Sequence, residues 1–123
     1  MKKLFVAAAL GLLASVSAHA EWVPLKDDPA VEINTSGLNL KGNYRNAFVQ
    51  IKGDDTLKDG RRYDRMAMQQ EFDCRMSSFR ITHLVFYDGN RIVESVQVPV
   101  GTPFTPAMPD THGFSTVMAV CNS

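Results

Sequence analysis

The sequence has no excess of charge of either sign, since its 123 residues include 13 basic and 13 acidic side chains. Nucleic-acid-binding domains usually carry a basic excess, so this balance argues against a nucleic-acid partner. Hydrophobic residues make up 45% of the chain and charged residues 21%. These proportions exclude a disordered chain, a collagen-like repeat and a protein with many membrane spans. The composition is that of a folded globular protein.

Catalytic and metal-binding motifs are also missing. The sequence contains no G-x-S-x-G, no P-loop, no G-x-G-x-x-G and no H-E-x-x-H. The motifs therefore indicate no cofactor and no metal, and we expect a protein without enzymatic activity.

One long apolar run is present, and it lies at the N-terminus. Lys2 and Lys3 precede the apolar segment Leu4–Val16, and Ala18-His19-Ala20 supplies the small residues of a cleavage site. The run is too short to span a bilayer. We therefore expect residues 1–20 to be a signal peptide cleaved after Ala20, with no membrane span or lipid anchor in the exported chain. Residues 21–123 are predicted to form a single domain that is periplasmic or secreted.

Cysteine is scarce, with Cys74 and Cys121 both in the exported part. An oxidising compartment favours their pairing. Closing the loop between them would stabilise the fold by about 4 kcal/mol in the chain-entropy model. A metal pair or a reactive thiol is the alternative, but no His or second Cys lies at ligand spacing. The sequence therefore predicts a disulfide.

Most of the exported chain has the pattern of β-strands. The predicted strands are Trp22-Val23, Ala30–Ile33, Tyr44–Ile51, Tyr63–Cys74, Phe79–Tyr87 and Arg91–Val98. Asn34–Asn43 is turn-rich, and the prolines from Pro99 to Pro109 are expected to prevent regular pairing.

Two predicted hairpins set the register of the sheet. With Arg75–Ser78 as a four-residue loop, Phe72 faces Ile81 and Met68 faces Val85 on one apolar face. The second hairpin turns at Asp88-Gly89-Asn90, a strong turn signal.

The C-terminal segment has the spacing of one helical face. After Asp110 or Thr111, either of which is a suitable N-cap, Phe114, Val117, Met118 and Cys121 recur at i, i+3, i+4 and i+7. The predicted fold is therefore α+β: an antiparallel sheet of about five or six strands, with one C-terminal helix packed on its core face and tied by the disulfide.

A polar cluster interrupts the apolar face. The same register places Gln70 opposite His83, with Glu94 opposite or diagonal to His83 depending on the turn. A hydrogen-bonded structural patch is one interpretation. An acid/base pair or a small-ligand site is the other. No nucleophile accompanies the cluster, which favours the structural interpretation.

Two further features are candidate partner-binding sites. Ala67, Phe86 and Val93 align as an apolar stripe on the other face, which either the N-terminal strands or a partner would cover. Arg61, Arg62 and Arg65 form a basic cluster, which is either a solvated loop end or a contact for an acidic partner.

Several segments, in order along nearly the whole exported chain, resemble the surface-adhesin E-like family of exported bacterial proteins. They are Glu21-Trp22-Val23, Tyr63-Asp64-Arg65, Glu71-Phe72-Asp73-Cys74, Phe79-Arg80-Ile81, Phe86-Tyr87 and Val120-Cys121. The resemblance implies an antiparallel sheet with a C-terminal helix tied by a Cys74–Cys121 bridge. It also implies binding to host extracellular-matrix or plasma proteins and self-association, so a homodimer is a further expectation. The sequence departs from the family in lacking a lipobox cysteine.

The functional hypothesis is an exported, non-enzymatic protein-binding module that, like an adhesin, binds extracellular-matrix or plasma proteins. A periplasmic inhibitor of an envelope-directed enzyme such as lysozyme is the alternative, with the acidic loop Gly53–Arg62 inserted into a cleft of a basic enzyme. A small ligand-binding or hydrolytic site at His83 and Glu94 is the third hypothesis.

Overall fold

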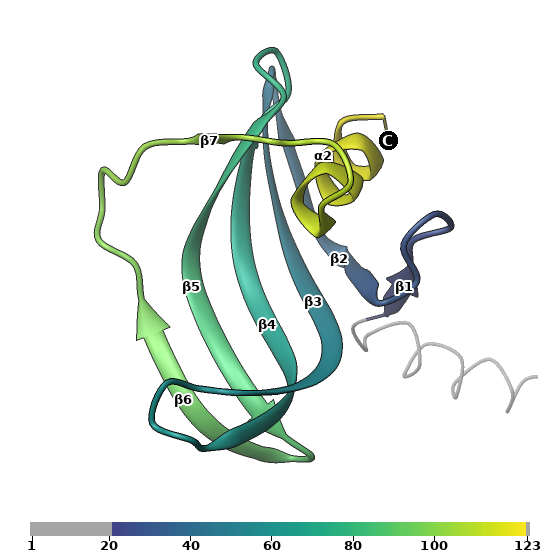
Figure 1. Ribbon diagram of the computed structural model, residues 1–123. Helices are drawn as coiled ribbons and strands as arrows, with labels where there is room; N and C mark the ends of the chain where they lie inside the picture. Colours follow the sequence, from purple (N-terminus) through teal and green to yellow (C-terminus); the bar gives the residue numbers. More distant parts are fainter. Residues whose placement is uncertain (1–20, 123) are drawn as a thin grey trace, which may run out of the picture.

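The computed structural model describes residues 21–122, with the backbone alone for residues 35–40. The predicted signal peptide, residues 1–20, lies outside the described residues. Within the described part, seven antiparallel strands form one sheet and one helix follows them (Figure 1). The elements are β1 (Trp22–Pro24), β2 (Val31–Lys41), β3 (Tyr44–Thr56), β4 (Arg62–Asp73), β5 (Ser78–Asp88), β6 (Arg91–Gln97), β7 (Thr105–Pro106) and α2 (His112–Cys121).

Strands β1 to β6 are neighbours in chain order, and β7 pairs with the start of β5. Each predicted strand is present, but three expectations about the loops were wrong. Gly53–Thr56, expected to belong to the acidic loop Gly53–Arg62, continues β3 and pairs with the start of β4. β2 continues to Lys41 through the segment expected to be turn-rich, because an irregularity between Asn34 and Asn39 keeps it paired with β3. Thr105–Pro106 pairs despite its proline, which an edge strand tolerates. The sheet therefore has seven strands where five or six were predicted.

Helix α2 packs against one side of the sheet, which we call the helix face; the opposite side is the outer face (Figure 1). The predicted disulfide is present and joins the end of β4 to the last turn of α2, with the Cα atoms of Cys74 and Cys121 5.5 Å apart. Between helix and sheet lies the core, made of Val31, Ala47, Val49, Met68, Phe72, Val117 and Val120. Because α2 has only ten residues, the molecule is mostly β and fits the α+β class loosely.

Local chemistry fixes both ends of α2. Thr111 is the N-cap, and its hydroxyl accepts a hydrogen bond from the backbone N–H of Phe114 at 3.1 Å. At the other end, Arg45 Nη1 donates to the carbonyl oxygen of Val120 at 2.6 Å. In the first turn, a Cβ atom on Gly113 would lie 2.8 Å from the ring of Phe79. Glycine therefore allows the helix to approach β5 this closely.

An irregularity in β5 decides which side chains reach the core. Gln70 pairs with Ile81, but Gln69 pairs with His83, so Thr82 is an extra residue on β5. The side chains after the bulge change faces, since a shift of one residue exchanges the two sides of a strand. Leu84 and Phe86 therefore lie on the helix face. Val85 and Tyr87, which were predicted to lie on the core face, belong to the outer face.

Candidate functional site

The structure does not bring the predicted polar cluster together. Gln70 is buried on the helix face beside Ile81, and Glu94 lies on the same face opposite Phe86. His83 lies on the outer face opposite Gln69, with its Nε2 3.0 Å from Ser95 Oγ. Two features cause this separation. The predicted register of the hairpin was wrong, since Phe72 pairs with Phe79 and not with Ile81, and the bulge at Thr82 then turns His83 to the outer face. His83 and Glu94 therefore cannot act as an acid/base pair.

The predicted arginine cluster is also divided. Arg61 reaches β6, where its guanidinium donates to the carbonyl oxygen of Val93 and to Glu94 Oε1, both at 2.7 Å. Arg65 instead lies over the ring of Tyr87, 4.1 Å from its centroid, on the outer face. Arg62 is exposed. The guanidinium groups of Arg61 and Arg65 thus contact different parts of the molecule.

Arg61 holds the loop between β3 and β4 against β6. This loop crosses the lower end of the sheet in Figure 1. The hydrogen bond to Glu94, followed by that to Asp59, raises the pKa of Arg61. The backbone N–H of Arg61 in turn lowers the pKa of Asp59. We call the hydrogen bonds of Arg61 to Val93 and Glu94 the Arg61 clamp. Next to this clamp, the rings of Tyr63 and Phe86 meet edge to face with centroids 4.8 Å apart.

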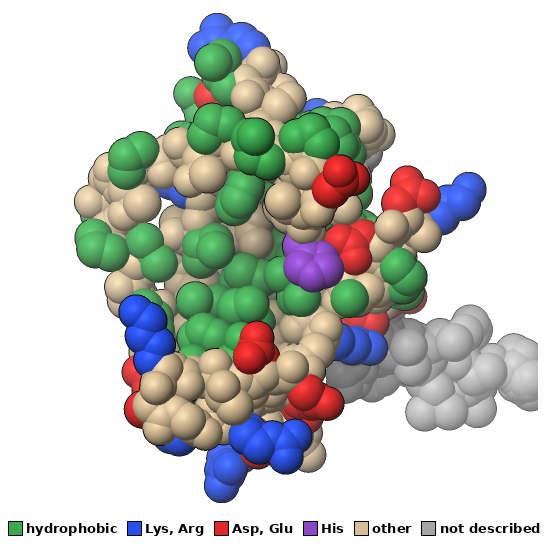
Figure 2. All heavy atoms as spheres, viewed as in Figure 1, with side chains coloured by type: hydrophobic (Ala, Val, Ile, Leu, Met, Phe, Trp, Pro, Cys, Tyr) green, Lys and Arg blue, Asp and Glu red, His purple; other side chains and the backbone are tan. Residues whose placement is uncertain are grey.

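Helix α2 covers only part of the helix face, and an apolar part stays open. We call this surface the open helix face and define it by Met66, Leu84, Phe86 and Val96, which the strand register places on one side of β4–β6. The first three are half-buried, and Val96 is 38% exposed. Figure 2 shows hydrophobic side chains gathered in the hollow between α2 and the β3–β4 loop.

The predicted apolar stripe is split between the two faces of the sheet. Phe86 belongs to the open helix face. On β6, Glu94 pairs with Phe86 and Ile92 pairs with Tyr87, so Val93 between them is an extra residue at the edge of that face. Ala67 pairs with Val85 on the outer face. The same bulge in β5 that moved His83 also separates Ala67 from Phe86.

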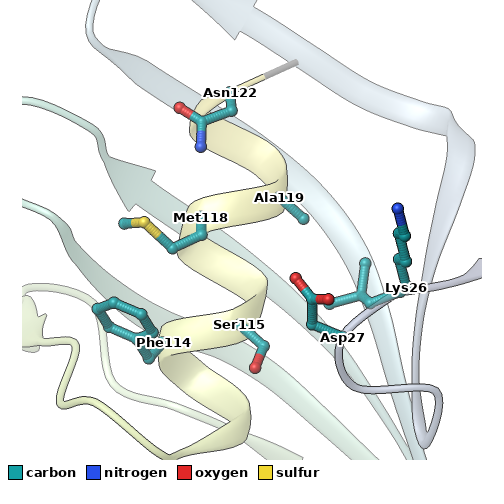
Figure 3. Close-up of a pocket in the computed structure, with 8 residues that line it drawn as sticks. Lys26, Asp27, Phe114, Ser115, Met118, Ala119 and Asn122 are labelled. Atoms are coloured by element: carbon teal, nitrogen blue, oxygen red, sulfur yellow. The ribbon is translucent and has the colours of Figure 1, made fainter.

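A groove of about 380 Å³ lies between α2 and the turn after β1 (Figure 3). Lys26 and Asp27 face Ser115 and Ala119, whereas Phe114 and Met118 point to the other side of the helix. Nearby, His112 Nδ1 lies 2.7 Å from Asp28 Oδ2 and ties the start of α2 to this turn. The polar and apolar side chains of the groove do not converge on one point, so it is a weak candidate for a ligand site.

The outer face carries aromatic side chains that the functional hypotheses did not include: Phe48 is exposed, and Trp22 and Tyr87 are half-buried. Trp22, Phe48 and Tyr87 line a hollow of about 330 Å³ together with Ala67, Gln69, His83 and Val85. Alternation in Tyr44–Ile51 already set Phe48 apart from the core residues Ala47 and Val49. Tyr87 could not be found in this way, because its face depends on the bulge.

Comparisons with solved structures identify the fold. Haemophilus influenzae protein E in crystal form II aligns with a TM-score of 0.61 at 12% identity, covering 85% of this chain and 90% of that one. Its selenomethionine form aligns with a TM-score of 0.58 at 11% identity, covering 85% and 88%. The protein from non-typeable Haemophilus influenzae aligns with a TM-score of 0.56 at 12% identity, covering 85% and 78%. The chain has the protein E fold. No family model and no curated protein matches the sequence.

Within this protein E fold, residues 21–122 contain no group of three or more His, Cys, Asp or Glu side chains able to hold a metal ion. No helix in the same range is long and apolar enough to cross a bilayer. The strongest candidate sites are therefore surfaces: the open helix face and the aromatic part of the outer face.

Proposed function

We propose that this protein is an exported, non-enzymatic protein-binding module that acts in the periplasm or outside the cell and binds extracellular-matrix or plasma proteins. The observation that carries the proposal is the protein E fold, which covers 85% of the chain. The Cys74–Cys121 disulfide supports an oxidising compartment. The likeness of the sequence to the surface-adhesin E-like family points to the same class of partner.

The open helix face is the proposed partner-binding surface. Its apolar centre, with Phe86 and Val96, is bordered by the charged pair Arg61–Glu94. Protein interfaces commonly combine an apolar centre with a polar rim. The clamp formed by Arg61 holds one edge of this surface in place before binding, which reduces the entropy lost on association.

A capture experiment tests the function. The oxidised protein beginning at Glu21 serves as bait for human plasma and matrix proteins and, separately, for bacterial envelope extract. We expect a matrix or plasma protein to be retained by the wild type and lost with Val96→Asp. Retention of only an envelope enzyme would contradict the adhesin-like proposal.

The inhibitor of an envelope-directed enzyme remains the second candidate. The observation that favours it is the exposed acidic stretch Asp54-Asp55 at the end of β3, next to the loop that Arg61 holds in place. Such a fixed acidic projection would complement a basic active-site cleft. This hypothesis predicts a stoichiometric complex with lysozyme that Asp54→Asn with Asp55→Asn weakens. Undiminished lysozyme activity at excess protein would exclude it.

A further inference from the structure

A row of side chains crosses the outer face from β3 to β6. Phe48, Gln69, His83 and Gln97 are partners in register on four adjacent strands. Neighbouring strands lie about 4.8 Å apart, so the row is about 14 Å long. Asn34 on β2 pairs with Phe48 and with Trp22 on β1, so the row extends to the edge of the sheet. An aromatic ring and two amides therefore lie along one line.

Two adjoining hollows follow this row. The first, of about 330 Å³, is lined by the aromatic residues Trp22, Phe48 and Tyr87. The second, of about 390 Å³, is lined by polar side chains that include Asn46 and Gln97. Phe48 and Gln69 line both hollows. Each hollow has the size of a small-molecule site, which begins at about 300 Å³.

The amides of the second hollow are available to a ligand. Asn46 and Gln69 are exposed, and within the described part of the chain their side chains make no hydrogen bond. Gln97 donates once, to the carbonyl oxygen of Thr82 at 3.3 Å, which leaves its own amide oxygen free to accept. Each amide side chain offers two donors and an acceptor. The surface can therefore donate and accept hydrogen bonds side by side.

The row itself is nearly neutral. Glu71, which borders the second hollow, is paired with Arg80 at 2.6 Å. The row contains no Lys, Arg, Asp or Glu. Arg65 borders the first hollow, where it lies over Tyr87 and donates to Gln50 Oε1 at 3.2 Å. A phosphate, a nucleic acid or an anionic membrane would require several cationic groups along the row, so these ligands fit poorly.

We propose that the outer face binds a neutral oligosaccharide along this row. A sugar ring has an apolar face of C–H groups that packs on an aromatic ring, and Phe48, which is 42% exposed, offers such a ring. Its hydroxyl groups both donate and accept, which matches the amides of Asn46, Gln69 and Gln97. The inference goes beyond the proposed protein-binding function and uses the opposite face of the sheet.

The single tryptophan of the sequence provides the test, because Trp22 lines the aromatic hollow. Its fluorescence is followed while cellotriose, maltotriose or the N-acetylglucosamine trimer is added, and a sialylated trisaccharide serves as the acidic comparison. We expect saturable binding of at least one neutral sugar. Phe48→Ala and Gln69→Ala should each weaken it about tenfold. Asn90→Ala, which removes an exposed amide from the β5–β6 turn, should not.

Three results would overturn the inference: no response to any neutral sugar, a response to the sialylated sugar alone, or equal binding by Gln69→Ala and Asn90→Ala. A captured glycoprotein that still binds after enzymatic removal of its glycans, yet is lost with Phe48→Ala, would assign the outer face to protein contacts instead. None of these results depends on Val96, so the inference and the proposed function can fail separately.

Discussion

Glu32 is a buried carboxylate on the outer face of the sheet. Glu32 is 8% exposed, and its Oε2 lies 2.9 Å from Lys52 Nζ. Its Oε1 accepts a hydrogen bond from Gln50 Nε2. Burial alone would raise the pKa of Glu32. The hydrogen bonds from Lys52 and Gln50, with the charges of Lys52 and Arg65, outweigh burial and lower it below its ordinary value of 4.5.

The first prediction concerns acid stability. The pKa of Glu32 is lower in the folded state than in the unfolded state. The ionised carboxylate therefore contributes its full stabilisation above pH 4.5, and this stabilisation is lost as the pH falls through the folded-state pKa. Glu32→Gln removes this pH-dependent stabilisation. Below pH 4.5 the melting temperature of the variant should therefore fall less steeply than that of the wild type. Thermal melts between pH 7 and pH 3 measure the difference. Parallel curves for the two proteins would contradict the assignment.

The second prediction concerns Gly113. Alanine has a helix propensity about 1 kcal/mol better than glycine. Its Cβ would lie 2.8 Å from the Phe79 ring, and overpacking costs about 1–3 kcal/mol. Gly113→Ala should therefore destabilise the protein by about 1 kcal/mol, whereas in a Phe79→Leu background it should stabilise. Urea unfolding of the four proteins checks this, and the same sign in both backgrounds would refute it.

At the scale of elements, the sequence allowed the strands to be predicted far better than their faces. In β4 the large apolar residues Met66, Met68 and Phe72 all occupy even positions, so their common face was predictable. In β5, Phe79 and Ile81 have odd numbers, but Leu84 and Phe86 have even ones. After Ile81, either Val85 and Tyr87 or Leu84 and Phe86 could face the core. Only the bulge at Thr82 decides between these two pairs. The candidate site at His83 was therefore wrongly placed.

The third prediction concerns the clamp on the β3–β4 loop. Arg61→Ala removes the hydrogen bonds to Val93 and Glu94, so the amides of residues 57–61 should exchange with solvent faster. Overall stability should change little, because the ion pair between Arg61 and Glu94 is exposed to solvent. Hydrogen exchange by NMR measures both. Arg62→Ala is the control, and equal exchange in the two variants would show that the clamp does not hold the loop.

At the scale of the whole molecule, the disulfide was predictable because the sequence has only two cysteines. The helix it ties down was predictable from the spacing of Val117 and Cys121. The proposed binding surfaces were not predictable, because each one collects side chains from several strands whose faces depend on bulges. Arg61 illustrates this limit, since its contacts with β6 come from residues more than thirty positions away in the chain.

The fourth prediction concerns the bridge between β4 and α2. Replacing Cys74 and Cys121 together by Ser frees a loop with a sequence separation of 47, which should lower the free energy of unfolding by about 4 kcal/mol. Urea unfolding of the oxidised wild type and the double variant measures the loss. A difference below about 1 kcal/mol would mean that packing alone fixes the helix on the sheet.

The open helix face is the proposed binding site for a protein partner. The most direct measurement is the affinity of the captured matrix or plasma protein for the wild type, Val96→Asp and Val100→Asp. Val96 lies on that face, whereas Val100 is fully exposed in the loop after β6. A charge buried in an apolar interface is costly, so Val96→Asp should weaken binding at least about tenfold while Val100→Asp leaves it unchanged. Equal affinities for the three folded proteins would contradict the claim.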